Sequence, residues 1–307
     1  MSRFATILHQ DAPRVGVVRD DHVALLPVAD MVTLIAGGNE MLAQVQRWVG
    51  TTGLEQVPLA GARWLAPIQR FRRDVLCTGW NYWDHFEEGI GRRDGQEVPR
   101  PTAPTFFTKG PDTIIGPYDD IAFDARLSAK WDYEVELVVV IGKRGRSIPA
   151  QRAMDHVWGY CLANDISQRD LQRRHGGQWL KGKSIDASTP LGPWLVPAGE
   201  LDPSTVRLQC MVNGTTLQDA GVRQMAFSIP ELIAEISFGM TLAPGDVLLT
   251  GTPSGVGHAR TPPLFLKAGD EVVTIGSGIG ELRNRLVETD LVGDSDIRVT
   301  PAIEPAA

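Results

Sequence analysis

The chain has 307 residues, 43% hydrophobic and 22% charged, with a formal net charge of −7. A chain of this length and composition can bury a sizeable core, in one large domain or in a main domain with a small partner. The acidic balance excludes a general polyanion binder, because no basic face is evident to release counterions from nucleic acid. We therefore expect small-molecule partners and no nucleic acid.

The first residues lack the long apolar core of a signal peptide, and no run in the chain approaches a membrane span. The expected location is the cytoplasm, without membrane association. Cys77, Cys161 and Cys210 are an odd, widely spaced set without a CxxC motif, which argues against a disulfide framework or a zinc ribbon. We expect buried thiols.

The first 66 residues predict a small α+β unit. Apolar runs near 4–8, 15–19 and 22–27 predict strands, and a helix is predicted over 41–49. We place a boundary near Pro67, which gives a small N-terminal domain, 1–66, and a second domain, 67–307. The second domain holds the residues with chemical potential.

Two glutamates lie at the start of the most apolar strand of the chain. The run 137–141 is continuously apolar and predicts a strand buried on both faces, while the alternation before it places Glu134 and Glu136 on one face. Like charges held this close repel, and burying them is costly unless a cation or a shared proton compensates. A divalent metal is the simplest remedy.

Asp165 ends the next predicted strand, 159–165, and could complete a three-carboxylate site. Oxygen ligands of this kind suit Mg²⁺, Mn²⁺ or Ca²⁺ rather than zinc. The alternative role for Asp165 is the N-cap of a helix predicted over 166–174, and the two roles are compatible.

His85 and Glu88 fall on one face of a short helix predicted over 81–89, because they are three residues apart. A histidine beside a carboxylate is a usable general base, since the carboxylate fixes its tautomer and supports its protonated form. The alternative is a surface histidine with a solvated glutamate. Lys109, which ends a predicted strand, either points into a cleft or is solvated, and we expect the solvated position. The polar segment 89–103 is either a lid or a plain surface loop.

Three glycine-rich segments resemble nucleotide or anion loops. Residues 177–184 fit the letters GxxxxGK[ST], but a basic helical segment precedes them and no long helix follows, so we reject nucleotide binding and keep Lys183 as a candidate functional cation. The glycines at 276–280 predict a strand kink rather than a dinucleotide loop. Residues 251–257 form either an anion-binding turn or a structural turn.

Several of these motifs, taken together and in order, resemble the fumarylacetoacetate hydrolase family. The resemblance covers roughly residues 70–290, and agreement of so many ordered motifs is far more specific than any one of them. The motifs are GWNY at 79–82 followed by His85 and Glu88, YEVEL at 133–137, NDISQRDLQ at 164–172, GKSID at 182–186 and TGTPSG at 250–255. Within the third motif, Ser167 and Gln168 replace the commoner Thr-Ala.

The resemblance implies a mainly β fold with short helices, an α+β mixed β-roll, usually in a homodimer and with bound Mg²⁺ or Mn²⁺. It assigns the metal to Glu134, Glu136 and Asp165, catalysis to His85, Glu88 and Lys183, and substrate binding to Arg169, Gln172 and Thr252. Lys183 would stabilise developing negative charge.

The expected function is metal-dependent, catabolic hydrolysis of the C–C bond of a 2,4-diketo acid of the acylpyruvate type, giving pyruvate and a carboxylic acid. His85 with Glu88 would activate the attacking water. Alternatives that use the same site are decarboxylation of a 2-keto acid such as oxaloacetate, and tautomerisation or isomerisation of a hydroxydienoate. The His85–Glu88 pair favours hydrolysis, because decarboxylation makes no intrinsic demand for an activated water. A binding protein that has lost catalysis is a further alternative.

Overall fold

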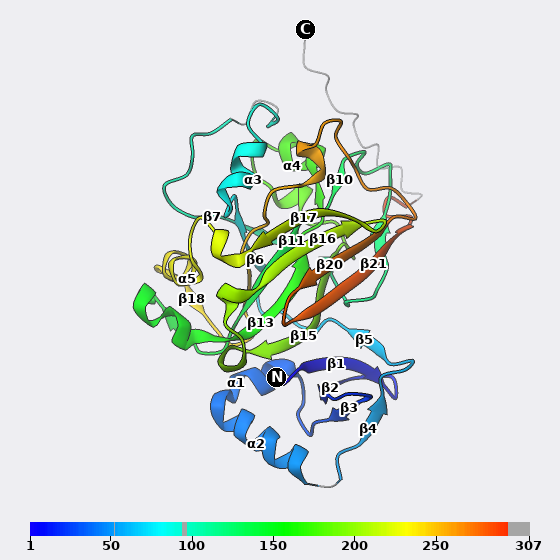
Figure 1. Cartoon of the computed structure of the whole chain (residues 1–307), viewed down its shortest axis with the longest axis vertical. Coiled ribbons are helices and arrows are strands. Elements are labelled where there is room, and N and C mark those ends of the chain that lie inside the picture. Colours follow the sequence, from blue (N-terminus) through cyan, green and yellow to red (C-terminus); the bar gives the residue numbers. More distant parts are fainter. Residues whose placement is uncertain (52, 94–96, 294–307) are drawn as a thin grey trace.

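Strands dominate the secondary structure, and the helices are short (Figure 1). This confirms the predicted fold class. The computed structural model describes residues 1–51, 53–93 and 97–293. Residues 94–96 of the polar segment 89–103, and most of the C-terminal tail, therefore lie outside the described residues.

A long mixed sheet runs through the molecule and carries the apolar run of the sequence at its centre. In spatial order its main path is β4 (Gln56–Pro58), β3 (His22–Leu25), β2 (Ala12–Val18), β1 (Phe4–His9), β15 (Thr189–Pro197), β13 (Val157–Asn164), β11 (Val135–Ile141), β19 (Val247–Leu249), β6 (Val75–Gly79) and β7 (Thr105–Lys109). Two further strands pair at its side, β5 (Arg63–Leu65) with β1 and β8 (Ile114–Ile115) with β15.

Every residue of β11 is buried, as predicted from its Val, Leu and Ile content. Strand β11 pairs antiparallel with β13 on one side and with β19 on the other. Because β11 has no exposed face, polar groups at its ends are held in fixed positions and away from water.

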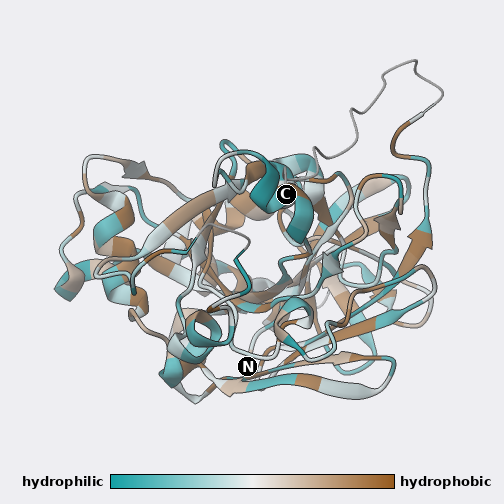
Figure 2. Ribbon diagram, turned by 90° about the horizontal axis from the view of Figure 1, so that it is seen from above, coloured by the Kyte–Doolittle hydropathy of each residue, from teal (hydrophilic) through white to brown (hydrophobic). Residues whose placement is uncertain are grey.

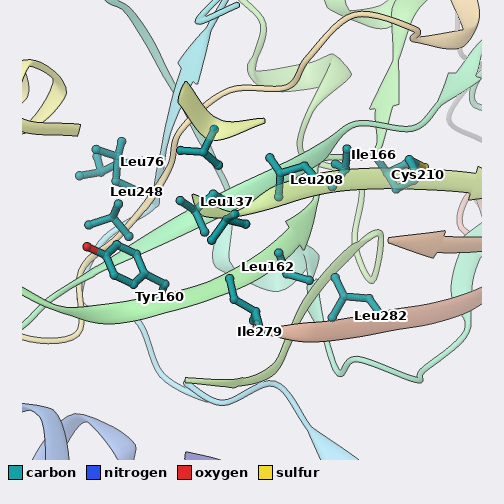
Figure 3. Close-up of a cluster of buried hydrophobic side chains, with 14 of the residues drawn as sticks. Leu76, Leu137, Tyr160, Leu162, Ile166, Leu208, Cys210, Leu248, Ile279 and Leu282 are labelled. Atoms are coloured by element: carbon teal, nitrogen blue, oxygen red, sulfur yellow. The ribbon is translucent and has the colours of Figure 1, made fainter. Parts of the chain in front are cut away.

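A second sheet of five strands covers one face of this centre. Its order is β17 (Thr215–Gly221), β16 (Arg207–Val212), β20 (Glu271–Gly276), β21 (Gly280–Glu288) and β9 (Ile121–Phe123). Side chains of both sheets share one hydrophobic cluster, in which Leu137 and Leu162 of the long sheet pack with Leu208 and Leu282 of the five-stranded sheet (Figure 3). Burial of this cluster fixes the two sheets against each other.

The first 66 residues, which are coloured blue in Figure 1, form the predicted α+β unit. This unit lies at one end of the long sheet. The predicted helix is present as α2 (Gly38–Gly50), and α1 (Met31–Ala36), which we did not predict, precedes it. Strand β1 pairs with β15, with Phe4 opposite Leu195, so the hydrogen bonding of this unit continues into the central sheet. The domain boundary near residue 66 stays a prediction.

Three short helices lie around the second domain: α3 (Trp83–Glu88), α4 (Arg169–Arg174) and α5 (Ile229–Ser237). Helix α4 begins three residues later than predicted, because β14 (Ser167–Gln168) pairs with β10 (Trp131–Asp132). Among the described residues no helix is long and apolar enough to cross a membrane. The helices mix hydrophilic and hydrophobic residues along their lengths (Figure 2).

Two smaller predictions have clear outcomes. The glycines at 276–280 do not kink a strand; they form the hairpin connection between β20 and β21, which makes that prediction wrong. Cys77, Cys161 and Cys210 are free and buried, as expected, and burial raises the pKa of each thiol.

Candidate active site

Three carboxylates meet where β11 begins and β13 ends. Glu134 precedes β11, Glu136 lies within it, and Asp165 follows β13; the antiparallel register brings the backbone N–H of Asp165 to 2.8 Å from the carbonyl oxygen of Glu134. One ligand atom from each carboxylate lies within 4.8 Å of the others, and all three side chains are buried. The structure therefore brings the predicted metal ligands together.

Lys183 and Arg169 neutralise part of this cluster. Lys183 Nζ lies 2.9 Å from Oε2 of Glu134 and 2.7 Å from Oδ2 of Asp165, and Arg169 Nη2 lies 2.6 Å from Oε1 of Glu134. Burial alone would raise the pKa of Glu134, but the charges of Lys183 and Arg169 outweigh burial and hold that pKa below its usual value. Glu134 is therefore an anion.

Glu136 has no ion-pair partner in the part of the chain that the structure describes. Its carboxylate accepts a hydrogen bond of 2.6 Å from the backbone N–H of Gly251. Burial, and then the charges of Asp165 and Glu134, raise its pKa well above the usual value. A cluster of hard oxygen donors with one uncompensated carboxylate fits a divalent cation, which would neutralise it.

Lys109 belongs to the cluster, so the expectation that it is solvated is wrong. It is fully buried, and its Nζ donates to Oδ1 of Asp165 at 2.7 Å and to the carbonyl oxygen of Ile166 at 3.0 Å. Asp165 also does not cap α4, whose N-cap is Gln168. Of the two roles considered for Asp165, the structure retains membership of the carboxylate cluster.

His85 and Glu88 form a pair on α3. Nδ1 of His85 lies 2.7 Å from Oε1 of Glu88, while Oε2 of Glu88 accepts a hydrogen bond of 2.8 Å from the backbone N–H of Gly255. A carboxylate only accepts, so the neutral imidazole carries its proton on Nδ1 and keeps Nε2 free. His85 is 8% exposed, which excludes the solvated-pair alternative.

His85 of the pair and Glu134 of the carboxylate cluster line one small cavity, with a volume of about 50 Å³. Six of the predicted site residues line it, and Glu88, Glu136 and Asp165 lie behind them. The lining residues are Thr78, Gly79, Trp80, His85, Gly89, Arg93, Phe107, Glu134, Arg169, Gln172, Arg173, Trp179, Lys183, Thr252 and His258. The catalytic and substrate-binding roles of these residues stay predictions.

The segment that resembles a phosphate loop has a different use. Leu180–Gly182 is a short 3-10 turn, and the next element after it is strand β15 rather than a helix. A Cβ on Gly182 would stand 2.2 Å from the backbone nitrogen of Gln172, so glycine is required where this turn crosses α4. The close crossing holds Gln172 and Lys183 on the same cavity.

The turn at 251–257 binds anions that belong to the protein itself. The backbone N–H groups of Gly251, Gly255 and Gly257 donate to the carboxylates of Glu136, Glu88 and Asp132 respectively. Backbone N–H donors of this kind fix carboxylates in position without adding a full charge. The turn therefore binds anions, as one of the two predictions had it, and these anions are carboxylates of the protein that it holds in position.

The hydroxyl of Thr252, a predicted substrate contact, is already used by the fold. It donates to the carbonyl oxygen of Val135 at 3.0 Å and accepts from Nε2 of Gln218 at 2.8 Å. What Thr252 offers the cavity is therefore mainly its methyl group.

Sequence reasoning missed Asp132 and His258. Asp132 is fully buried, and its carboxylate accepts from Arg169 Nε at 2.9 Å and lies 3.2 Å from Nδ1 of His258. Burial would raise the pKa of Asp132, but Arg169 and His258 lower it to about 2. No local pattern marks this set, because His258 lies far from Asp132 in the sequence.

The residues at 74–287 match the family model described as "Fumarylacetoacetate (FAA) hydrolase C-terminal". The chain therefore belongs to the fumarylacetoacetate hydrolase family, a family of enzymes. This confirms the predicted membership, which rested on ordered motifs within the same region.

The chain is also similar to individual proteins of this family. The chain is 44% identical over 259 residues to a mitochondrial oxaloacetate tautomerase of Bos taurus, covering 84% of this chain and 79% of that protein. It is 40% identical over 264 residues to the oxaloacetate tautomerase YisK of Bacillus subtilis, covering 83% of this chain and 86% of that protein. A solved fumarylacetoacetate hydrolase from Exiguobacterium antarcticum superposes with a TM-score of 0.79 at 34% identity, covering 94% of this chain and 100% of the other.

Proposed function

We propose that this protein catalyses keto–enol tautomerisation of a small 2-keto diacid of the oxaloacetate type. The observation that carries the proposal is the His85–Glu88 pair, which presents a free imidazole Nε2 to the same small cavity as the buried cations Lys183 and Arg169. Tautomerisation needs a base for a C–H proton and positive charge for the resulting oxyanion. The identity of 40–44% to two oxaloacetate tautomerases supports this choice of reaction.

His85 is the proton carrier of the proposed reaction. Its Nε2 removes a proton from C3 of the keto acid, the C–H electron pair forms the C2–C3 double bond, and the carbonyl π electrons move to the oxygen on C2. Return of the proton to that oxygen gives the enol, and return to C3 restores the keto form. Glu88 stabilises the imidazolium that exists between the two transfers.

The negative charge of the enolate oxygen is met by the cations on the cavity wall. The pKa of Lys183 is raised, because the negative charges of Asp165 and Glu134 outweigh the effect of burial. Lys183 therefore stays protonated. A divalent cation, Mg²⁺ or Mn²⁺, held by Glu134, Glu136 and Asp165 would supply further positive charge beside the developing oxyanion.

The size and charge of the cavity favour a short, doubly charged acid. Its volume of about 50 Å³ is far below the roughly 300–1,000 Å³ of pockets that hold drug-sized ligands. Arg93 lines its wall beside Arg169 and Lys183, so both carboxylates of a diacid find guanidinium or ammonium donors. An extended diketo acid would need the wall to open.

A second candidate is the C–C hydrolysis of an acylpyruvate that the sequence predicts. The observation that favours it is again the His85–Glu88 pair, because a fixed Nε2 base can equally deprotonate a water that attacks the 4-carbonyl. The structural likeness to a fumarylacetoacetate hydrolase supports the same reaction. In this case Lys183 would stabilise the pyruvate enolate that leaves.

One assay separates these reactions. EDTA-treated protein is reloaded with Mg²⁺ or Mn²⁺ and given enol-oxaloacetate, keto-oxaloacetate, a hydroxydienoate and a set of acylpyruvates, while enol and dienoate absorbance, pyruvate and CO₂ are followed. Metal-dependent enol–keto conversion without pyruvate release supports the tautomerase. Pyruvate plus a carboxylic acid from acylpyruvates supports the hydrolase, pyruvate plus CO₂ from oxaloacetate indicates a decarboxylase, and conversion of a hydroxydienoate alone indicates an isomerase.

The homodimer, the cytoplasmic location, the catabolic role and the absence of a nucleic-acid partner stay predictions. We propose the homodimer on the family resemblance, and light scattering of the purified protein measures it directly. A monomer that turns over oxaloacetate would overturn the dimer without affecting the proposed reaction.

A further inference from the structure

A second histidine on the cavity wall has no part in the reaction described above. His258 belongs to the short 3-10 turn Gly257–Ala259, and its side chain is 12% exposed. Its backbone N–H donates to Oδ2 of Asp132 at 3.0 Å, and its Nδ1 lies 3.2 Å from the same oxygen. Asp132 therefore holds the ring at its Nδ1 edge, and His258 is one of the residues that line the cavity.

The hydrogen bonds of Asp132 define which ring nitrogen carries the proton. Its two oxygens accept from the backbone N–H groups of Tyr133, Gly257 and His258 and from Nε of Arg169. A carboxylate with this many donors is ionised and has only acceptor capacity for the imidazole. The proton of a neutral His258 is therefore on Nδ1, and Nε2 presents a lone pair.

His258 is neutral near pH 7. Its burial, together with the nearby charge of Arg169, lowers its pKa to about 4, although Asp132 acts in the opposite direction. Nε2 is then a hydrogen-bond acceptor fixed in direction by the contacts at the opposite edge of the ring.

Most acceptors on this wall already have a task. Arg93, Arg169 and Lys183 are donors without acceptor capacity. The oxygens of Glu134 and Gln172 accept from Lys183 and Arg169, and Nε2 of His85 is the proton carrier of the proposed reaction. Carboxylates and a carbonyl oxygen of a bound acid would be satisfied by the donors. A hydroxyl proton on the same acid would need an acceptor, and His258 Nε2 supplies one.

We propose that His258 is a specificity-determining residue that recognises a hydroxyl group of the bound diacid, with its Nε2 accepting a hydrogen bond from the O–H of the enol. The inference rests on the proposed function in that it takes the ligand to be a short dicarboxylate. Asp132 is the positioning residue that holds the ring. His85 and His258 thus have the same construction and different tasks, since His85 moves a proton and His258 selects the hydroxylated form.

Two stable four-carbon acids test this without turnover. Malate and succinate have the same two carboxylates and differ by one hydroxyl, and their binding to the Mg²⁺-loaded protein is measured by calorimetry. The wild type is expected to bind malate about tenfold more tightly than succinate, which corresponds to one net hydrogen bond.

A matched pair of variants assigns that preference to Nε2. In His258→Asn the amide NH₂ can replace Nδ1–H at Asp132, but nothing reaches the position of Nε2, so the preference should fall to about onefold with succinate affinity unchanged. In His258→Gln the longer amide places an oxygen near the position of Nε2, so most of the preference should return. Thermal unfolding of both variants checks that each is folded.

A wild-type measurement covers the case in which His258→Asn does not fold. With ¹⁵N-labelled histidine, the Nε2 resonance of His258 should shift on addition of malate and stay in place with succinate. Equal affinity for the two acids, absence of binding, or a preference that His258→Asn keeps would overturn the inference. Failure of oxaloacetate turnover with the hydroxyl preference intact would instead overturn the proposed function alone.

Discussion

Glu88 and Gly255 are joined by a hydrogen bond of 2.8 Å, although they are 167 residues apart in the sequence. The other oxygen of Glu88 holds Nδ1 of His85 at 2.7 Å. The loop after β19 therefore determines how the histidine on α3 presents its second nitrogen. Which ring nitrogen of His85 carries the proton therefore depends on two segments that are distant in the sequence.

Glu88→Gln should lower turnover by roughly 10²–10⁴-fold while leaving the fold intact. The amide oxygen can still accept from Gly255, which leaves the NH₂ group to donate to Nδ1 of His85. The proton of the imidazole then moves to Nε2, and the base is lost. Steady-state kinetics on oxaloacetate and thermal unfolding measure the two effects.

The control is Glu87→Gln, because Glu87 is the exposed neighbour on the same helix and its side chain is 59% exposed. Full activity is expected. Loss of activity in both variants, or in neither, would contradict the assignment of Glu88 as the group that orients His85.

Divalent metal should raise the melting temperature, and Glu136→Gln should abolish that rise. At a concentration of about 100 times Kd, a ligand that binds only the folded state adds about 2.7 kcal/mol to the free energy of unfolding. Without metal, Glu136→Gln should be at least as stable as the wild type, because the amide still accepts from Gly251 while the repulsion from Glu134 and Asp165 is removed.

Differential scanning fluorimetry of EDTA-treated protein with and without Mg²⁺ or Mn²⁺ measures both effects. Glu235→Gln is the control, since Glu235 is an exposed carboxylate on α5, outside the cluster. A metal-induced rise that survives in Glu136→Gln would show that the cation binds elsewhere.

Gly182→Ala should separate the two segments that hold Gln172 and Lys183. The added Cβ would lie 2.2 Å from the backbone nitrogen of Gln172, and backbone atoms cannot rotate away as the end of a side chain can. We expect the free energy of unfolding to fall by about 1–3 kcal/mol. We also expect turnover to fall by more than this loss of stability explains. Gly199→Ala is the control, because a Cβ at Gly199 meets nothing within 4 Å.

Urea unfolding and turnover of both glycine variants check this prediction. Equal effects at the two positions would indicate a general cost of replacing glycine rather than a steric conflict at the crossing.

Acid should destabilise the protein between about pH 6.5 and pH 4, and part of the effect should come from His258. The pKa of His258 falls from 6.5 to about 4 in the folded state. In that window the unfolded chain binds a proton that the folded chain does not, so the free energy of unfolding decreases as pH falls. The contribution is on the order of 3 kcal/mol.

His258→Asn removes this titration, so the slope of unfolding free energy against pH should become shallower between pH 6.5 and pH 4. Urea unfolding at several pH values measures the slope. His156→Asn is the control, since Nδ1 of His156 bonds to the carbonyl oxygen of Lys143, outside the cavity. A slope unchanged by His258→Asn would contradict the neutral state of this histidine.

The sequence predicts those parts of the site whose cause is local. Glu134 and Glu136 are found because an alternating stretch runs into a continuous apolar strand, and the three-residue spacing of His85 and Glu88 places both on one helical face. The motifs of the family then supply the order of the remaining site residues. At these positions the local sequence pattern and the family motifs select the same residues.

The residues that sequence reasoning misses depend on contacts between distant segments. The sequence presents Lys109 as an ordinary lysine at the end of a strand, and only the position of Asp165 directly after β13 explains its complete burial. Asp132 and His258 are 126 residues apart, and neither has a local pattern that predicts the other. The start of α4 is likewise displaced by pairing between β14 and β10.

The pairing of β1 with β15 has a consequence for biosynthesis. Phe4 leaves the ribosome among the first residues, whereas its partner Leu195 follows only after about half of the second domain has been made. At about 5–20 residues per second, that interval is roughly ten to forty seconds. During this time β5 can pair with β1 at Thr6, Ile7 and Leu8, but the Phe4 end of that edge lacks its partner. Binding of a chaperone to this end would protect the nascent chain from association with other chains.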